Sequence, residues 1–524
     1  MKKILFLLFI IININLNAQL ELVPDNPILH NITVLSLSEK EEILQLPPLE
    51  INYINQNTNR NGTRVVYFLH GLGGNSNSWQ RAAIACENAD CNVEGFHARK
   101  VESFQIDYSV NTNTDMNGAL NSIRNFIRNN NVNSLPEYDH DKTNNFIIAH
   151  SQGGVVLRSL LKYDTYDSPN LSGQTRGYGG FVTVASPLQG AMILNNQEKI
   201  LEMAEEGCNK LFRAKTNNVF AKTLFWLLGK DLVGISCEAL SFNALPYFFK
   251  DEFAPITDDY HVGSLWIDKL NTSCNNQTYI DMPKVAFYGI EPNTNIFWRT
   301  LNWFNKSPND PVYWEANDDF GFFLNTIMPV FLDYNLNLIL SQIRKKNVQN
   351  YMKWLWGYGF PGIVTYNSLL FECDEKISAW QAGVDWFISA NDKWETIIGS
   401  KQIVLDYTET LYLCFSESWF PPVLTLPIPN YCPPGYSYTN PQFSGTQYHY
   451  KTIHKESDGV VLAESAYDLP HATHDPVKHR GIENTDGTYT GSSHMQIRND
   501  KALKDNLHLL FEGEYGMYFK TDEK

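Results

Sequence analysis

The sequence predicts an α/β fold built on a doubly wound, mostly parallel β-sheet. Five short segments are rich in β-branched and aromatic residues and are followed by glycine or polar turns: 65–69, 101–106, 146–149, 181–185 and 285–288. They lack alternation of apolar and polar residues, which is typical of strands buried on both faces. Helical patterns over 117–128 and 151–163 lie between them. Alternating strands and helices imply a parallel sheet with helices on both faces.

Two long stretches interrupt this rhythm, residues 191–283 and residues 292–457. The second holds nine of the twelve tryptophans, so it has either a core of its own or a surface for apolar ligands. We favour the core and expect both stretches to be insertions that form a helical, aromatic-rich cap. The remaining parts, 19–190, 284–291 and 458–524, then make one α/β core that ends in an amphipathic helix with Leu503, Leu507 and Leu510 on one face.

Residues 1–18 have the pattern of a secretory signal peptide. Lys2 and Lys3 precede an apolar run from Ile4 to Ile12, and Ala18 provides a small residue for cleavage. The run is too short to span a bilayer, and no other segment is apolar enough. We therefore expect export to the periplasm or the extracellular space. The formal charge of −16 makes nucleic acid an unfavourable partner.

Export changes the interpretation of the eight cysteines, because oxidising compartments favour disulfides. Cys86 and Cys91 are near enough in sequence for a local bridge. Each insertion holds three further cysteines: 208, 237 and 274 in the first, 373, 414 and 432 in the second. If all eight were oxidised, at least one bridge would join the insertions. No CxxC pair occurs, so zinc binding is not indicated.

The feature that points most directly to chemistry is the segment Phe146-Ile-Ile-Ala-His-Ser151-Gln-Gly-Gly, which ends a strand and opens a helix. A nucleophilic serine at such a turn needs small residues two positions before and after it, because the backbone is tight there. Ala149 and Gly153 occupy these positions. The helix N-terminus also favours a developing oxyanion beside Ser151. The alternative is a structural turn serine.

On these residues the chain resembles the α/β-hydrolase fold, and within it secreted bacterial lipases and esterases with an A-H-S-x-G-G nucleophile elbow. Ala149 departs from the commoner first glycine of G-x-S-x-G. The resemblance covers the core strands and the C-terminus, not the insertions. It implies that the backbone N–H groups of Leu72, in Phe68-Leu-His-Gly-Leu-Gly-Gly74, and of Gln152 form the oxyanion hole. A plain glycine turn is the alternative for the first segment.

The resemblance also implies residues that contact substrate. His70 and Gly71 belong to the expected oxyanion segment, and Leu188 lies in a segment, 183–191, that resembles a wall of the lipase cleft. We expect these three residues to bind substrate. For His70, as for His150, a packing or hydrogen-bonding role is the plainer interpretation.

In this fold the catalytic residues follow in the order serine, acid, histidine. Asp458 lies in Ser-Asp458-Gly-Val-Val, which resembles the segment that carries the lipase acid, and Asp475 and Asp486 are the fallback acids. His494 precedes the last helix, where the family's base is found. Both assignments have a plain alternative, since Asp-Gly also makes turns. The cluster of His471, His474 and His479 could bind a metal, but a solvated loop is the favoured interpretation.

The predicted function is a secreted serine hydrolase of the lipase and esterase type that cleaves acyl or lipid esters through Ser151, His494 and Asp458. The partners expected are an ester substrate and a lipid–water interface, with an apolar helical segment at 219–229 as candidate lid. No cofactor is required, and no ligand set for a structural calcium can be assigned. The alternatives are an acyltransferase, polyesterase or amidase on the same fold, and a catalytically silent binding protein. The oligomeric state cannot be derived.

Overall fold

The structure is a computed structural model, and it describes only part of the chain. The described residues are 64–72, 74–79, 101–108, 116–127, 142–167, 176–216, 254–291, 296–305, 328–357, 363–413, 428–429 and 442–520, apart from isolated positions between 482 and 499. The predicted signal peptide, the candidate lid and five of the eight cysteines (86, 91, 237, 414 and 432) lie outside these ranges, and so do Gly73 and Asp486.

A six-stranded parallel sheet forms the centre of the α/β core, in the order β2-β1-β3-β4-β5-β9. Its strands are β1 (Arg64–Leu69), β2 (Val101–Ile106), β3 (Phe146–His150), β4 (Gly180–Val184), β5 (Lys284–Gly289) and β9 (Val477–His479). All five strands expected from the sequence are present, and the predicted fold class is confirmed. The short β9 adds the sixth strand at one edge.

Each face of the sheet is covered by its own apolar layer. In β1, Val65, Tyr67 and Leu69 pack in one cluster of buried residues, and Val66 and Phe68 pack in another. The first cluster includes residues of α3 (Met116–Asn125) and α4 (Gln152–Leu161), and the second includes the apolar face of α19 (Lys501–Glu512). Because successive strand side chains point to opposite faces, a strand buried on both sides needs apolar residues throughout.

The remaining helices belong mostly to the two insertions. The first contains α6 (Met192–Asn195), α7 (Gln197–Thr216), α11 (Ala254–Asp258), α12 (Leu265–Ser273) and α13 (Gln277–Ile280). The second contains α14 (Ile296–Asn305), α16 (Met328–Gly357) and α17 (Ile363–Ile398). The other helical segments are η2 (Ser76–Trp79), η7 (Lys142–Asn144), η8 (Lys162–Asp167) and α18 (Ala463–Tyr467). None of the described helices is long and apolar enough to cross a membrane.

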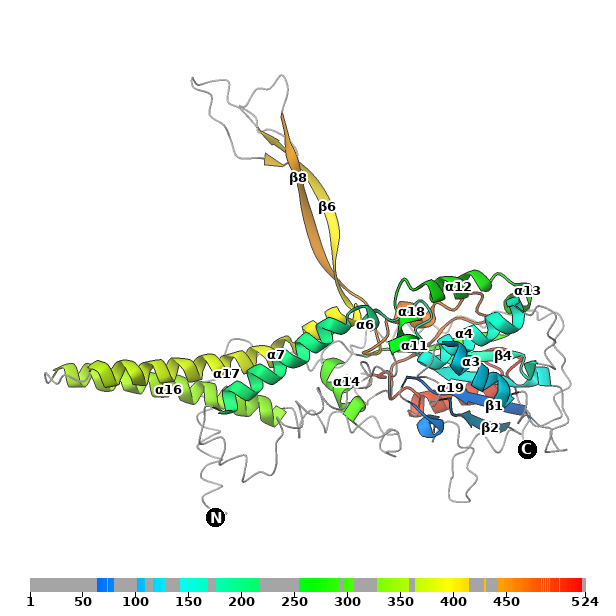
Figure 1. The fold of residues 1–524 in the computed structure, drawn as a ribbon, viewed down its shortest axis with the longest axis horizontal. Coiled ribbons are helices and arrows are strands. Elements are labelled where there is room, and N and C mark those ends of the chain that lie inside the picture. Colours follow the sequence, from blue (N-terminus) through cyan, green and yellow to red (C-terminus); the bar gives the residue numbers. More distant parts are fainter. Residues whose placement is uncertain are drawn as a thin grey trace, which may run out of the picture. The chain divides into compact units, whose positions relative to one another are not determined.

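An aromatic cluster joins the helices of the second insertion. Trp298 of α14 packs against Trp386 and Phe387 of α17, and Trp380 of α17 packs against Tyr334 of α16. These tryptophans are 0–1% exposed. The long helices α16 and α17 lie side by side (Figure 1). The described tryptophans of this cluster therefore serve as core, as the sequence led us to favour.

The two insertions pack together through the helices α7 and α17. Gly207 of α7 lies so close to the Trp386 ring that a side chain would collide with it, and Glu206 forms an ion pair with Lys393 of α17. Cys274 and Cys373 are buried free thiols. The assumption that all eight cysteines are oxidised is thus wrong for these two, and the need for a bridge between the insertions disappears with it.

Residues 399–455 form a separate compact unit. Its strands β6 (Lys401–Leu413) and β8 (Gln442–His454) pair in antiparallel fashion over their full length, with the short β7 (Ile428–Pro429) beside β6. Ile403, Leu405 and Tyr450 on this ribbon are more than half exposed. This sheet differs from the helical cap expected for the second insertion, since residues 401–413 and 442–454 are strands.

Candidate active site

Ser151 occupies a strained turn between β3 and α4. Its backbone has φ 55° and ψ −129°, and its N–H donates to the carbonyl of Val184 (2.9 Å). A non-glycine residue rarely adopts a positive φ, so the surrounding packing must hold the turn in place. A Cβ on Gly153 would lie 2.5 Å from the carbonyl oxygen of His70, which explains the small residue two positions after the serine. The backbone therefore presents Ser151 at the carboxyl end of the sheet.

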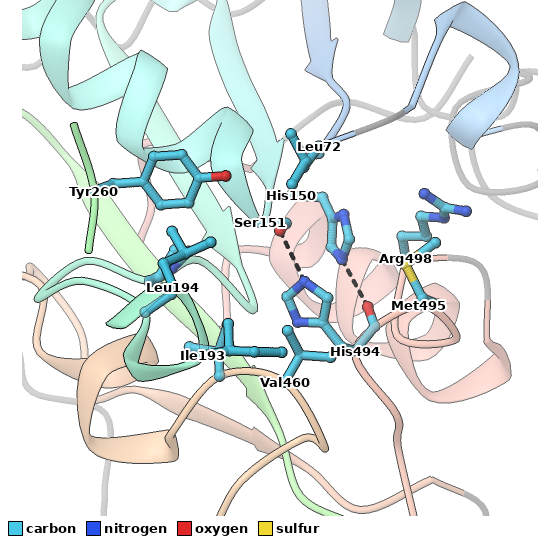
Figure 2. Close-up of a pocket in the computed structure, with 14 residues that line it drawn as sticks. Leu72, His150, Ser151, Ile193, Leu194, Tyr260, Val460, His494, Met495 and Arg498 are labelled. Atoms are coloured by element: carbon cyan, nitrogen blue, oxygen red, sulfur yellow. Dashed lines mark hydrogen bonds between the residues drawn. The ribbon is translucent and has the colours of Figure 1, made fainter. Parts of the chain in front are cut away.

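Three side chains from distant parts of the chain meet at this turn, and Figure 2 shows two of them, Ser151 and His494. The Ser151 hydroxyl donates to Nε2 of His494 (2.8 Å), and Nδ1–H of His494 donates to Oδ2 of Asp458 (2.7 Å). All three residues are buried, with exposures of 8%, 4% and 1% for Ser151, His494 and Asp458. A single tautomer of His494 satisfies both hydrogen bonds. This is the geometry of a serine nucleophile with its base and an orienting acid.

The loops after β5 and β9 bring the acid and the base together. Gly289 ends β5, and a Cβ there would lie 2.6 Å from the carbonyl oxygen of Ser492 and 3.1 Å from Cβ of Asp458. The backbone N–H of His494 donates to the carbonyl of Asp458 (2.8 Å). Since parallel strands end at the same edge of the sheet, β1, β3, β5 and β9 deliver all of these loops to one place.

The acid loop is held by its own carboxylate and by the second insertion. Oδ1 of Asp458 accepts the N–H groups of Val460 (3.0 Å) and Val461 (2.8 Å), which leaves Oδ2 for His494. Gly459, with φ +93°, turns its carbonyl toward Nε1–H of Trp394 on α17 (2.8 Å) and the hydroxyl of Thr300 on α14 (3.4 Å). The insertion thus fixes the loop that carries the acid.

Both residues expected to form the oxyanion hole adjoin Ser151. Leu72 lines the same pocket as the Ser151 side chain. Gln152 is the first residue of α4, where a helix N–H has no intrahelical acceptor. Both residues therefore lie next to the nucleophile, and their role in an oxyanion hole stays a prediction.

Only one of the three residues expected to bind substrate lines the pocket. Gly71 lines the pocket, but His70 and Leu188 do not. The His70 ring is 1% exposed and stacks on Tyr108, donating through Nδ1–H to the carbonyl of Gly71 (2.9 Å) and accepting at Nε2 the N–H of Tyr108 (3.3 Å). Leu188 is fully buried in the core, and its carbonyl accepts from Arg158 (2.5 Å). Both residues therefore pack and position loops instead of contacting the pocket.

Part of the pocket wall was predicted from the sequence, since Pro187 and Ala191 belong to the expected cleft wall, 183–191. The pocket is lined in addition by His150, Pro187, Ala191, Ile193, Leu194, Tyr260, Val460, Val461, Met495 and Arg498. Tyr260 is held at the pocket by tertiary packing, because its carbonyl accepts the N–H of Ala191 (2.9 Å). Ile193 and Leu194 follow the expected cleft wall closely in the sequence, and Val460 and Met495 lie near the catalytic candidates Asp458 and His494. In Figure 2, Tyr260, Leu194 and Ile193 lie on one side of Ser151, His150, Met495 and Arg498 lie on the other, and Val460 lies below it beside His494.

The other histidines and acids lie elsewhere. His471 and Asp475 are exposed, and Nδ1–H of His474 donates to the carbonyl of Asp475 (2.7 Å). His479 is buried beside Asn506, and burial lowers its pKa to about 3. Among the described residues, no group of three or more histidines, cysteines or carboxylates could hold a metal ion.

The fold and this geometry define the class of protein: an α/β-hydrolase-like fold that carries a serine, histidine and aspartate in hydrogen-bonded sequence. Comparison with known families agrees with the fold. Residues 60–240 match the model of the family described as the PGAP1-like alpha/beta domain, which is of the α/β-hydrolase type. This match covers β1 to β4 and Ser151, and not Asp458 or His494. No curated protein and no solved structure gave a match.

Proposed function

We propose that the protein is a serine hydrolase that cleaves carboxylic esters, with Ser151 as nucleophile, His494 as base and Asp458 as the residue that orients His494. The continuous hydrogen-bonded chain from the Ser151 hydroxyl through His494 to Asp458 carries the proposal. The similarity to a hydrolase-type domain family supports it.

The reaction proceeds in two halves. Oγ of Ser151 attacks the ester carbonyl while its proton moves to Nε2 of His494. The N–H groups of Leu72 and Gln152 stabilise the oxyanion, and the alcohol leaves with the proton from His494. Water then attacks the carbonyl of the acyl-enzyme and gives a proton to His494. The carboxylic acid product leaves as His494 returns this proton to Oγ of Ser151. The imidazolium formed in each half is stabilised by the Asp458 carboxylate.

The apolar side of the pocket suits the acyl chain. Ile193, Leu194 and Val460 offer aliphatic surface close to Ser151, and the Tyr260 ring adds to it. We propose an acyl or lipid ester as substrate on this basis, because burying an acyl chain there contributes about 0.8 kcal/mol for each methylene group. Export through residues 1–18 is also a proposal. N-terminal sequencing of the secreted protein should then begin near Gln19.

A fluorophosphonate probe tests the nucleophile. The wild-type protein should be labelled, and Ser151→Ala should not. Ser159→Ala is the control and should be labelled, because Ser159 is a buried serine of α4 whose hydroxyl donates to the Val155 carbonyl. Turnover of p-nitrophenyl esters of increasing chain length then tests the substrate class. An unlabelled wild type would favour a binding protein, and labelling without ester turnover would favour a transferase or an amidase.

A further inference from the structure

The long helix α16 carries apolar side chains on two opposite faces. One face packs into the aromatic cluster, where Phe331 contacts Phe387 and Tyr334 contacts Trp380. The apolar side chains on the other face are 40–61% exposed. They form the α16 stripe, which consists of Leu332, Leu336, Leu340, Ile343, Tyr351 and Trp354.

The spacing of the α16 stripe places its members in a straight line along the helix. Neighbouring members are three or four residues apart, except at Asn347, the polar residue in the gap between Ile343 and Tyr351. Leu332, Ile343 and Trp354 follow one another at intervals that correspond to three turns of helix. At a rise of about 1.5 Å per residue, the stripe is about 33 Å long. A contiguous exposed apolar surface of this kind marks an interaction site.

Basic residues flank the α16 stripe. The helix has one acidic residue, Asp333, and its basic residues are Arg344, Lys345, Lys346 and Lys353, whereas the whole chain has a formal charge of −16. Lys346 lies beside the stripe because it follows Ile343 by three residues, and Lys353 is on the same flank two turns further along. Both lysines are exposed. One rim of the stripe is therefore cationic in an otherwise acidic chain.

The other two basic residues are held by α17. Arg344 forms an ion pair with Glu372 (3.7 Å), and Lys345 forms one with Asp374 (2.5 Å). Lys346 and Lys353 form no ion pair with any residue that the structure describes. The charge of these two lysines is thus available to an anionic partner.

The carboxyl-terminal end of the stripe is aromatic. Tyr351 and Trp354 are 61% and 57% exposed, and their rings stack with centroids 6.0 Å apart. Tyrosine and tryptophan combine an apolar ring with a polar group, and they are enriched where hydrocarbon meets water at a membrane. Leucines and aromatic rings on one face with lysines at its edge are typical of a helix that lies in a lipid–water interface.

We infer that α16 docks on a membrane surface that contains anionic lipids. The helix lies in the plane of the interface, with the α16 stripe against the acyl chains and with Lys346 and Lys353 among the anionic headgroups. This inference goes beyond the proposed function, because it concerns binding to lipid and not the chemistry at Ser151.

The same charges oppose a second copy of the chain as the occupant. Closed dimers are symmetric, so residues near the symmetry axis meet their own copies. In an antiparallel pair of α16 helices centred on Ile343, Arg344 and Lys346 of one protomer lie close to the same residues of its partner. A parallel pair in register has the same effect. A lipid surface with anionic headgroups has the opposite charge and attracts these residues.

Sedimentation of the full chain with sucrose-loaded vesicles tests the inference. The wild type should bind vesicles of equimolar phosphatidylcholine and phosphatidylglycerol at least about fivefold more tightly than vesicles of phosphatidylcholine alone. Leu340→Glu puts a carboxylate in the middle of the stripe, so binding to the mixed vesicles should fall at least about tenfold. The double variant Lys346→Glu/Lys353→Glu should lose the preference for the mixed vesicles.

Leu509→Glu is the matched control, because it makes the same change at an exposed leucine of α19 and should bind as the wild type does. A wild type that binds neither kind of vesicle, or a Leu340→Glu variant that binds as well as the wild type, would overturn the inference. Sedimentation velocity without vesicles provides a further check, since a dimer that Leu340→Glu dissociates would identify a second copy as the occupant and overturn it too. Loss of fluorophosphonate labelling at Ser151 would instead refute the proposed function, and vesicle binding would still decide this inference.

Discussion

Trp394→Phe tests whether the second insertion positions the acid. Nε1–H of Trp394 is the nearer of the two side-chain donors to the Gly459 carbonyl, at 2.8 Å against 3.4 Å for Thr300. Phenylalanine keeps most of the ring, which packs on Phe297, but leaves this buried carbonyl without its better donor. Loss of the hydrogen bond should cost about 1–3 kcal/mol of unfolding free energy.

Trp298→Phe provides a control with the same loss of ring atoms. Trp298 is 1% exposed, and its Nε1 has no hydrogen-bond partner among the described residues. Its replacement removes packing and no hydrogen bond, so the difference between the two variants isolates the contact with Gly459. Urea denaturation of both variants and the wild type gives this difference.

Activity should follow the same contact. Release of Gly459 allows Asp458 to move relative to His494, and a displacement of about 1 Å in such a group can reduce the rate by about 100-fold. We expect kcat for a p-nitrophenyl ester to fall about 10- to 100-fold in Trp394→Phe, with little change in KM. Trp298→Phe should retain kcat. Equal losses of stability in the two variants, or an unchanged kcat in Trp394→Phe, would refute the positioning role.

Three further predictions concern the site and its supporting loop. Asp458→Asn keeps a side-chain oxygen that accepts the N–H groups of Val460 and Val461, but it places an NH2 group against Nδ1–H of His494. We therefore expect kcat to fall about 10⁴-fold with unchanged circular dichroism. Gly71→Ala puts a Cβ against Ser151, so fluorophosphonate labelling should slow at least about 100-fold, and normal labelling would contradict the packing described. Asp500, whose pKa burial raises from 3.8 to about 7, binds a proton in the native state that the unfolded chain has already released between these values. The contribution of Asp500 to the unfolding free energy should therefore fall as pH rises from 5 to 7, so the difference in unfolding free energy between the wild type and Asp500→Asn should change over this range in urea titrations; a difference that is independent of pH would count against it.

The sheet could be predicted because its information is local. Each core strand is a short apolar run that is buried on both faces, as in β3 and β4. The ribbon of β6 and β8 could not be predicted in the same way. Its register pairs Lys401 with His454, which are far apart in the sequence, so no local turn motif indicates the pairing. Its apolar residues Ile403 and Leu405 are exposed, so no pattern of buried residues indicates it either.

The candidate site also contains residues that could be predicted from the sequence and residues that could not. Ser151 could be found because a tight strand-to-helix turn restricts its neighbours, and Asp458 and His494 because chain order and short segments marked them. Tyr260 could not be found, because it reaches the pocket only through the backbone contact with Ala191. His70 shows the opposite error: it lies next to a pocket residue in sequence, but stacking on Tyr108 turns its ring into the core.

The second insertion starts and ends at one point of the core, since the N–H of Glu291 donates to the carbonyl of Ser457 (2.8 Å). A segment whose ends meet in this way can be long without disturbing the strands that flank it. The next residue, however, is Asp458, and its loop is held by Trp394 and Thr300 from within the insertion. The alignment of the acid with His494 therefore depends on the aromatic helices of the insertion. Trp394→Phe should therefore lower both the unfolding free energy and kcat, whereas Trp298→Phe should lower the unfolding free energy and leave kcat unchanged.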